Sequence, residues 1–228
     1  MRGDGDGWFR DLDGVRHWGR YGAAGLLLRT PLDESGRTAV LLQLRGQGRA
    51  ATRRTWTIPG GACDSHETAA EAALREAREE AGVDARRVRV RGERISTTAL
   101  GGWTYTTVVA DTPAPLPTRR DRETLALRWI PEDEVPNLRL HPDFRDAWPR
   151  LRAQPIYLAD TAGADSGVHS DEPFRPRTVD LGPLGFIWLY RSGAPTGRTA
   201  RVTDGPIPFY QRPTDELLLS AGQVFDRP

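Results

Sequence analysis

Lysine is absent from this chain of 228 residues, and all 32 basic residues are arginine. That absence excludes a Schiff-base lysine and a Walker-type phosphate loop, because both require the lysine amine. Cysteine occurs once, as Cys63, so the chain has no partner for an internal disulfide and no cysteine metal cage. A single thiol favours a reducing compartment, and we expect a cytoplasmic protein.

Long apolar runs and an excess of charge of one sign are also missing. The N-terminal stretch MRGDGDGWFRDLDG has no apolar core, so we expect no signal peptide. The longest apolar runs of the chain are far shorter than the roughly 20 residues of a membrane span. The net charge of +1 gives no overall field that would attract nucleic acid or an anionic membrane. We therefore expect neither of these as a partner.

Short apolar segments bounded by turn residues predict a strand-rich first part. A helix is predicted within residues 143–153, where Pro149 should kink or end it. Strands on both sides of a helix, in mixed order, favour an α+β sandwich. The predicted strands lie within residues 21–31, 38–45, 55–61, 88–97, 103–112 and 126–130.

The composition changes near Gln154, where Pro, Gly, Ser and Asp become frequent. We therefore divide the chain into a domain of residues 1–153 and a C-terminal extension of residues 154–228. The extension contains an apolar segment that predicts a strand within 182–193, and a short helix is predicted within 213–222. Its aromatic side chains should be buried, either on the domain or on a second subunit, so a homodimer stays open.

The segment from Thr68 to Gly82 predicts the helix of greatest interest. Thr68 and Glu71 fit a capping box at its start, and Gly82 suits the left-handed position after its end. Apolar residues recur at helical spacing and predict the buried stripe. The stripe consists of Ala70, Leu74, Ala77 and Ala81.

Three carboxylates share another sector of this helix. At about 100° per residue, Glu79 and Glu80 lie near −60° and +40° from Glu76. Such crowding of like charge is unfavourable, whereas a hard cation such as Mg²⁺ is bound by converging oxygen ligands. We therefore predict a metal site here. Arg75 lies beside it and is expected to pair with Glu67.

This stretch resembles the Nudix box, G-x5-E-x7-R-E-U-x-E-E-x-G-U, in which U is a bulky aliphatic residue. The fixed positions match in identity and spacing, and Ala77 stands where the pattern has Ile, Leu or Val. The departure concerns packing rather than catalysis. The matching residues are Gly61, Glu67, Arg75, Glu76, Glu79, Glu80, Gly82 and Val83.

The resemblance implies a Nudix fold, which is a mixed sheet sandwiched between helices, and hydrolysis of a nucleoside diphosphate linked to another group. Glu76, Glu79 and Glu80 would bind Mg²⁺ or Mn²⁺ with the carbonyl of Gly60 or Gly61. In that reading Glu67, Arg75 and Gly82 are structural members of the box.

Two residues outside the box are candidates by the same resemblance. Glu123, six residues before Trp129, would be a further metal ligand or the general base. Arg45, at the end of a predicted strand, would contact a substrate phosphate.

The second signatures of Nudix enzymes for ADP-ribose, diadenosine polyphosphates, NADH or coenzyme A are not found. By elimination we expect the substrates of MutT-like members, which are (deoxy)nucleoside triphosphates such as 8-oxo-dGTP. An ADP-ribose or other nucleotide-sugar pyrophosphatase is the alternative, and a third hypothesis is a nucleotide sensor without catalysis.

Overall fold

The computed structural model describes residues 3–46, 52–157 and 175–190. Two strands form its centre, β3 (Ala23–Pro31) and β4 (Thr38–Arg45), and both are buried over most of their length. They pair antiparallel only where residues 29–31 meet residues 38–40, and beyond that point they separate. The two strands therefore form a hairpin, and they diverge toward the other end of the sheet.

The separation between these strands is occupied by the segment that contains the Pro59-Gly60-Gly61 turn. β5 (Trp56–Thr57) pairs with the end of β4, and β6 (Gly60–Ala62) pairs with the start of β3. Between them the Leu26 N–H donates to the Pro59 carbonyl at 2.9 Å. The divergence of the strands thus places the glycine turn inside the sheet rather than at its edge.

Three further strands complete this mixed sheet, whose order is β5-β4-β3-β8-β7, with β6 also beside β3 and β9 also beside β4. β8 runs parallel to β3, whereas β7 is antiparallel to β8 and β9 is antiparallel to β4. Their bounds are β7 (Arg89–Thr98), β8 (Thr104–Asp111) and β9 (Thr124–Pro131).

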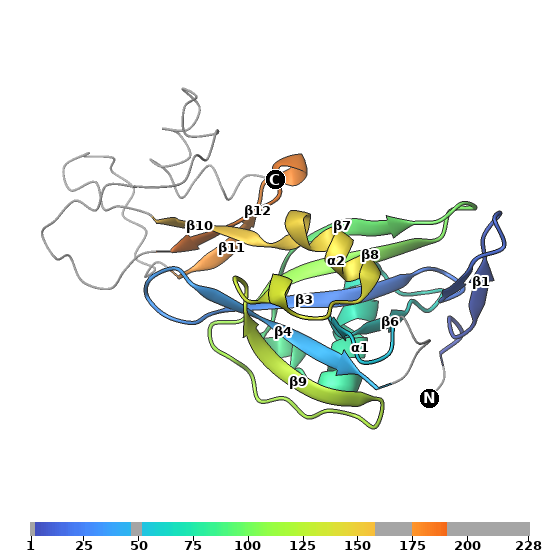
Figure 1. The fold of residues 1–228 in the computed structure, drawn as a ribbon, viewed down its shortest axis with the longest axis horizontal. Coiled ribbons are helices and arrows are strands. Elements are labelled where there is room, and N and C mark those ends of the chain that lie inside the picture. The colour runs from blue at the N-terminus through green and yellow to red at the C-terminus, as the bar shows by residue number, and fades with distance from the viewer. Residues whose placement is uncertain (1–2, 47–51, 158–174, 191–228) are drawn as a thin grey trace, which may run out of the picture.

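One helix covers each face of the sheet (Figure 1). α1 (Ala69–Ala81) packs on Leu26 and Leu28 of β3. The intervening Leu27 belongs to the opposite core, with α2 (Pro142–Leu151). Successive side chains of a strand point to opposite faces, so one short apolar strand serves both cores.

Pro149 does not end α2 where the sequence suggested that it could, since the helix continues to Leu151. It lies in the last turn, and only two helical residues follow it. Three 3₁₀ helices occur in the described residues, at Ala85–Arg87, Val135–Asn137 and Gly182–Leu184.

The described part of the extension forms a second sheet of three strands, in the order β10-β12-β11 (Figure 1). Phe186 and Trp188 of β12 belong to the same core cluster as α2. These two side chains of the extension therefore pack against α2, and the division of the chain after residue 153 stays a prediction. The predicted helix within 213–222 lies outside the described residues. The bounds are β10 (Ala153–Tyr157), β11 (Arg177–Asp180) and β12 (Phe186–Tyr190).

A buried polar cluster, which we call the Arg29 network, links the two sheets. The fully buried Arg29 pairs with Glu132 and donates to the Thr178 hydroxyl at 2.9 Å and to the Leu151 carbonyl at 3.0 Å. Asp111 accepts from the Thr178 N–H at 2.7 Å and from its hydroxyl at 2.6 Å. β11 is thus held to the main sheet by charge-assisted hydrogen bonds, the strong class of such bonds.

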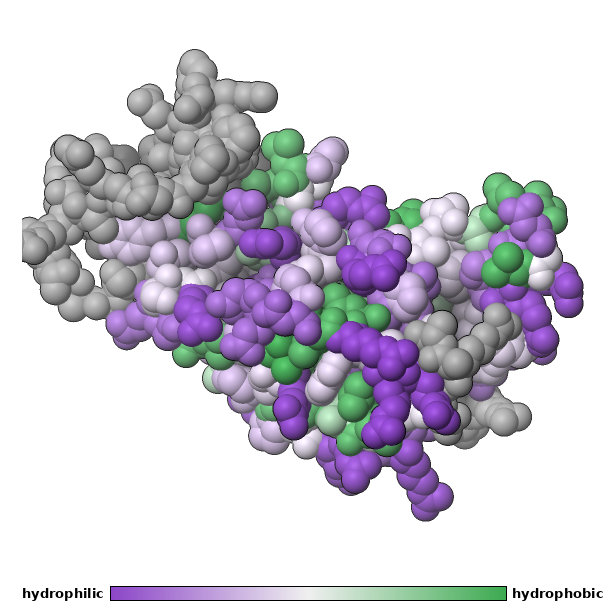
Figure 2. All heavy atoms as spheres, viewed as in Figure 1, coloured by the Kyte–Doolittle hydropathy of each residue, from purple (hydrophilic) through white to green (hydrophobic). Residues whose placement is uncertain are grey.

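An N-terminal hairpin, β1 (Trp8–Arg10) and β2 (Arg16–Trp18), was not foreseen from the polar start of the sequence. Trp8 and Trp18 are exposed, although their rings contact each other edge to face at 5.2 Å. Figure 2 shows hydrophobic residues at this end of the molecule. No helix among the described residues has the length and apolar character to cross a membrane.

Candidate active site

Helix α1 begins and ends as its sequence predicted. The Glu71 N–H donates to the Thr68 hydroxyl, and the Glu71 carboxylate accepts from the Thr68 N–H at 2.8 Å. Gly82 has a φ of 70°, and its N–H bonds back to the last turn. Caps at both ends satisfy terminal backbone groups and fix where the helix begins and ends. Its buried alanine face, packed on the sheet, sets the direction of the glutamates it carries.

The buried stripe of α1 differs in part from the prediction. Ala77 and Ala81 are fully buried as expected, whereas Ala70 and Leu74 are only half-buried at its margins. Two residues that the prediction omitted, Ala72 and Ala73, are fully buried instead. Small side chains on this whole face allow the helix to lie close to β3 and β6.

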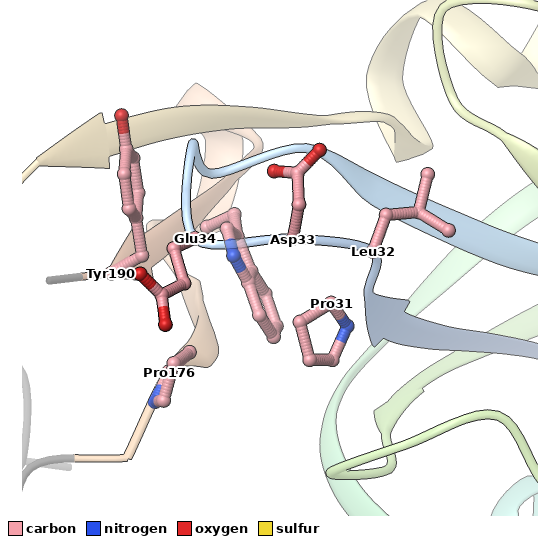
Figure 3. A pocket seen from close by; sticks show the side chains of 7 residues that line it. Pro31, Leu32, Asp33, Glu34, Pro176 and Tyr190 are labelled. Atoms are coloured by element: carbon pink, nitrogen blue, oxygen red, sulfur yellow. The ribbon is translucent and has the colours of Figure 1, made fainter. Parts of the chain in front are cut away.

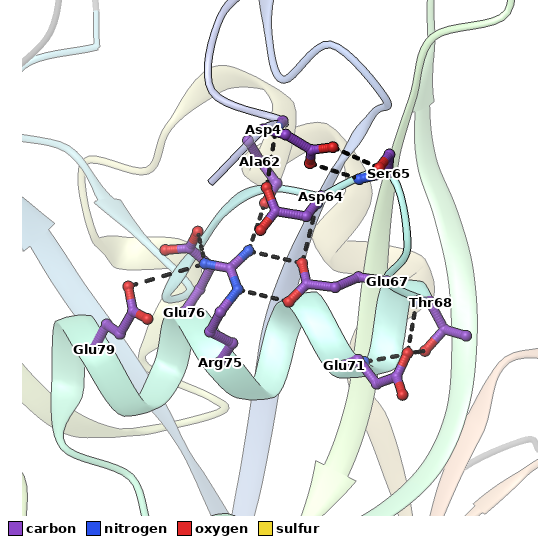
Figure 4. Close-up of polar contacts among 11 residues, drawn as sticks. Asp4, Ala62, Asp64, Ser65, Glu67, Thr68, Glu71, Arg75, Glu76 and Glu79 are labelled. Atoms are coloured by element: carbon purple, nitrogen blue, oxygen red, sulfur yellow. Dashed lines mark hydrogen bonds and ion pairs between the residues drawn. The ribbon is translucent and has the colours of Figure 1, made fainter. Parts of the chain in front are cut away.

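Arg75 braces the loop that precedes the helix (Figure 4). Its Nε and Nη2 donate to the two Glu67 oxygens at 2.7 and 2.9 Å, and Nη2 also donates to the Ala62 carbonyl at 2.8 Å. Hydrogen bonds from Arg75 hold the pKa of Glu67 below its usual value. The predicted pair between Glu67 and Arg75 is therefore confirmed.

Cys63, on the same loop, shows no sign of an activated nucleophile. It is buried, and burial together with the nearby Glu67 charge raises the pKa of its thiol to about 11. A thiol reacts as its thiolate, so Cys63 is inert near neutral pH.

Glu80 is the most enclosed of the three candidate metal ligands. Its Oε2 accepts from the Gly60 N–H at 2.9 Å and from the Gln43 side-chain amide at 3.0 Å. Burial raises its pKa to about 7, and the neighbouring Glu76 charge adds to that shift. Glu80 therefore holds a proton well above the pH at which an exposed glutamate loses it.

The other two carboxylates have different environments. The Glu76 Oε1 accepts from Arg75 Nη1 at 2.7 Å, and burial raises the pKa of Glu76. Glu79 has a side chain that is 53% exposed, and its closest charged neighbour is Arg75 at 3.9 Å. The three carboxylates thus grade from buried to exposed along one helix face.

These oxygens suit a hard divalent cation, although they do not converge in their present positions. In the described part of the chain, no three His, Cys, Asp or Glu side chains lie close enough together to hold an ion. Glu76 is directed to Arg75 and Glu80 to Gly60, so each has another hydrogen-bond partner. A Cβ at Gly61 would lie 2.6 Å from Glu76 Cδ, so only glycine leaves this carboxylate its place beside the turn.

Gln43 is a member of the site that the sequence did not reveal. It is almost fully buried on β4, and its Oε1 accepts from the Thr124 hydroxyl at 3.1 Å while its amide donates to Glu80. Gln43 thereby ties α1 to the start of β9. The available signal was its position as the polar residue within the apolar run Ala39–Leu44.

Arg45 lies near this cluster, on the last position of β4. Its Nε is buried and has no hydrogen-bond partner in the described structure. Its charge acts on Glu80, whose pKa it lowers against the opposing effect of burial. An unpaired guanidinium nitrogen beside a carboxylate cluster suits an oxyanion such as phosphate.

Glu123 lies near the same end of the sheet. Its carbonyl accepts from the Gly46 N–H at 2.8 Å, and the neighbouring Thr124 pairs with Arg45 in the β4–β9 register. The Glu123 side chain is exposed. Its role as metal ligand or general base stays a prediction.

A pocket of about 280 Å³ lies elsewhere, at the turn between β3 and β4 (Figure 3). Its lining includes Trp188 and Tyr190 from β12 and the carboxylates of Asp33 and Glu34. It is at the opposite end of β3 from Gly60, and its acidic lining does not suit a polyphosphate. The glutamate face of α1 is therefore the better candidate for the active site.

Comparisons with known proteins identify the family of the chain. A family model described as "NUDIX domain" matches residues 23–151. A protein of Mycobacterium tuberculosis named "Putative 8-oxo-dGTP diphosphatase 3" is 51% identical over 196 residues, which cover 82% of this chain and 85% of that protein. A "Nucleoside triphosphate pyrophosphatase/Nudix hydrolase fusion protein" of Bifidobacterium longum is 37% identical over 158 residues, which cover 68% of this chain and 32% of that protein.

A solved structure gives the same result. The crystal structure of a Nudix hydrolase from M. smegmatis, RenU, matches with a TM-score of 0.60 and 49% identity, covering 64% of this chain and 92% of that chain. The chain therefore belongs to the NUDIX family, and it has the α+β Nudix fold that the box implied. It is a Nudix hydrolase.

Proposed function

We propose that this chain is a divalent-metal-dependent diphosphatase of (deoxy)nucleoside triphosphates, with oxidised purine nucleotides such as 8-oxo-dGTP among its substrates. The observation that carries the proposal is the placement of Glu76 and Glu80 beside the Gly60-Gly61 turn, with Glu79 on the same helix and Arg45 Nε, which has no partner among the described residues, nearby. The relative from M. tuberculosis, whose name includes this activity, supports the choice of substrate.

The three glutamates and a carbonyl of Gly60 or Gly61 would hold Mg²⁺ or Mn²⁺. Such a cation, when bound, polarises phosphoryl oxygens and lowers the pKa of a bound water. The protein's part is to hold the metal-binding carboxylates beside the Gly60-Gly61 turn. Gln43 and the Gly60 N–H position Glu80, and Arg75 positions Glu76.

Arg45, whose Nε has no partner among the described residues, would bind a phosphate through its guanidinium group, and Glu123 would act as a further ligand or as the base that takes the proton of the attacking water. The exposed position of Glu123 lets it reach a substrate that enters from solvent. We keep the cytoplasm as the expected location, because of the single thiol.

ADP-ribose hydrolysis is the alternative, and a sensor without catalysis is the third hypothesis. The presence of all the box glutamates argues against the sensor, because a protein that only binds nucleotide does not need the full ligand set.

A substrate panel with a metal titration tests the proposal. The full-length protein would be incubated with dGTP, 8-oxo-dGTP and ADP-ribose, with Mg²⁺, Mn²⁺ or a chelator, and the products separated by chromatography. We expect 8-oxo-dGTP to give the nucleoside monophosphate and pyrophosphate, or the diphosphate and phosphate, only with metal present. Full activity in excess chelator would contradict the metal site, and faster hydrolysis of ADP-ribose than of either triphosphate would contradict the substrate.

A further inference from the structure

The loop that carries Glu123 is fastened to the last turn of α1. The Arg119 N–H donates to the Ala81 carbonyl at 2.9 Å, and the Asp121 N–H donates to the Glu80 carbonyl at 3.2 Å. The last carbonyls of a helix have no partner within the helix, so this loop supplies donors that α1 itself lacks. The loop and the end of α1 that carries Glu80 therefore hold each other in place.

Asp121 also shapes the loop through its side chain, which is half-buried. Its Oδ1 accepts from the Glu123 N–H at 3.0 Å and from the Thr124 N–H at 2.8 Å. Aspartate side chains that accept from N–H groups a few residues further on stabilise turns, and this one leads the chain into β9. The Glu123 carbonyl accepts from the Gly46 N–H at 2.8 Å. Both backbone polar groups of Glu123 are therefore fixed, although its side chain is exposed.

A line of hydrogen bonds leads from this turn to the Glu80 carboxylate. Thr124 is almost fully buried, and its hydroxyl donates to Gln43 Oε1 at 3.1 Å. The Gln43 amide donates to Glu80 Oε2 at 3.0 Å, and the same oxygen accepts from the Gly60 N–H at 2.9 Å. Asp121 is thus linked to Glu80 twice, through the backbone at the end of α1 and through Thr124 and Gln43 at the carboxylate. Hydrogen bonds in such a network support one another, so loss of one member weakens the rest.

We propose that Asp121 is a positioning residue for the hydrolysis reaction, and that it sets the Glu80 carboxylate and the Glu123 loop relative to each other. It acts through Thr124 and Gln43 and does not touch the substrate. The inference rests on the proposed function, because Glu80 and Glu123 are assigned their roles there. It adds that both depend on one side chain that belongs neither to α1 nor to the box.

Amide hydrogen exchange of the full chain, measured by NMR without metal or substrate, tests the linkage itself. Asp121→Ala should speed exchange at Gly60 about 3- to 10-fold, because the carboxylate that accepts from this N–H loses its support. Asp121→Asn keeps an oxygen acceptor and should retain most of the protection. An aspartate that only stabilises its own turn would affect exchange at Glu123 and Thr124 and leave Gly60 unchanged.

Asp33→Ala is the matched control, because Asp33 Oδ1 accepts from the Ser35 N–H at 2.8 Å in the turn between β3 and β4. It removes the same kind of bond at the other end of β3 and should not alter exchange at Gly60.

Thr124→Val removes the hydroxyl link alone. It should speed exchange at Gly60 as Asp121→Ala does, and the double variant should add little to either change, because both single changes break the same line of bonds. Unchanged exchange at Gly60 in Asp121→Ala, or full additivity in the double variant, would overturn the linkage.

Steady-state hydrolysis of 8-oxo-dGTP with Mg²⁺ tests the role in the reaction. Asp121→Ala should lower kcat about 10-fold, the low end of the effect of groups that orient metal ligands, with KM within about twofold of wild type. Asp121→Asn should restore most of kcat, and Asp33→Ala should match wild type in both constants. An unchanged kcat in Asp121→Ala would overturn the positioning role. A wild-type protein that hydrolyses neither 8-oxo-dGTP nor dGTP would instead contradict the proposed function, and exchange at Gly60 would still decide whether Asp121 supports Glu80.

Discussion

The Arg29 network and the glutamate face of α1 are two charged regions near opposite ends of β3, and they differ in how their charges are matched. In the Arg29 network, each nitrogen of the guanidinium has an acceptor, and both Asp111 oxygens have donors. On the glutamate face, burial raises the pKa of Glu80 to about 7, and Arg45 Nε has no partner within the described part of the chain.

The difference indicates what each region is for. Matched buried charges fix one arrangement of the chain, because breaking any one of them leaves another unpaired. Unmatched charges cost stability, and groups with strongly shifted pKa values concentrate at functional sites because the chemistry there requires such shifts. The first region should therefore respond to mutation in stability, and the second in metal binding and rate.

The largest effect is expected when the extension is removed. Truncation after Arg152 deletes Phe186 and Trp188 from the main core, and loss of one large aromatic side chain costs about 3–5 kcal/mol. Domains have only about 5–15 kcal/mol of stability, so we expect no cooperative unfolding transition in circular dichroism melting. Truncation after Tyr190 is the control that keeps all described strands. A melt of the shorter protein that matches the full chain would show that the extension is dispensable.

Breaking the Arg29 network directly should have the next largest effect. Arg29→Met leaves Glu132 in a mostly buried position without its cation, which should cost about 3–5 kcal/mol of unfolding free energy in urea titration. Arg37→Met is the matched control, since Arg37 pairs with Asp133 at 3.3 Å on the surface and should cost less than about 1 kcal/mol. Similar losses in the two variants would refute the contrast between the regions.

The sequence predicted the local parts of this structure well. The capped ends of α1 and the pair between Glu67 and Arg75 follow from spacings within one turn or loop, and all are present. The stripe on α1 was partly wrong because alanines occupy so many of its positions that composition does not fix which of them face the sheet.

Contacts between distant residues were not predictable in this way. The Gln43–Glu80 hydrogen bond, the Arg29 network and the Asp4–Ser65 contact join residues that are 37, 149 and 61 positions apart. They depend on the divergence of β3 and β4 and on the return of the extension to the core. Residue spacing within a single helix or strand predicts neither of these features.

On the glutamate face, Glu79→Gln should reduce the rate of hydrolysis about a hundredfold or more, which corresponds to at least about 2.7 kcal/mol of transition-state stabilisation. Stability should change little, because Glu79 is half exposed. Glu71→Gln on the same helix is the control, since glutamine also completes a capping box and should cost at most about 1 kcal/mol with an unchanged rate. Equal rate losses would mean that the catalytic face of α1 has been misassigned.

The smallest expected effect concerns pH. The pKa of Glu80 is about 7 in the folded protein against an ordinary value of 4.5, so the folded state holds a proton that the unfolded state releases. This contribution to stability is fully present below pH 4.5 and is lost as the pH rises to about 7. Glu80→Gln has no such proton to lose, and its amide oxygen retains an acceptor for the Gly60 N–H. In chelator the variant should therefore gain about 2–3 kcal/mol relative to wild type between pH 4.5 and pH 8, as measured by urea unfolding across that range.

Added Mn²⁺ at pH 8 should stabilise the wild type more than the variant, because the ionised carboxylate is the better ligand. Parallel stability curves for the two proteins would show that Glu80 ionises normally, and that the glutamate face is no less well matched than the Arg29 network.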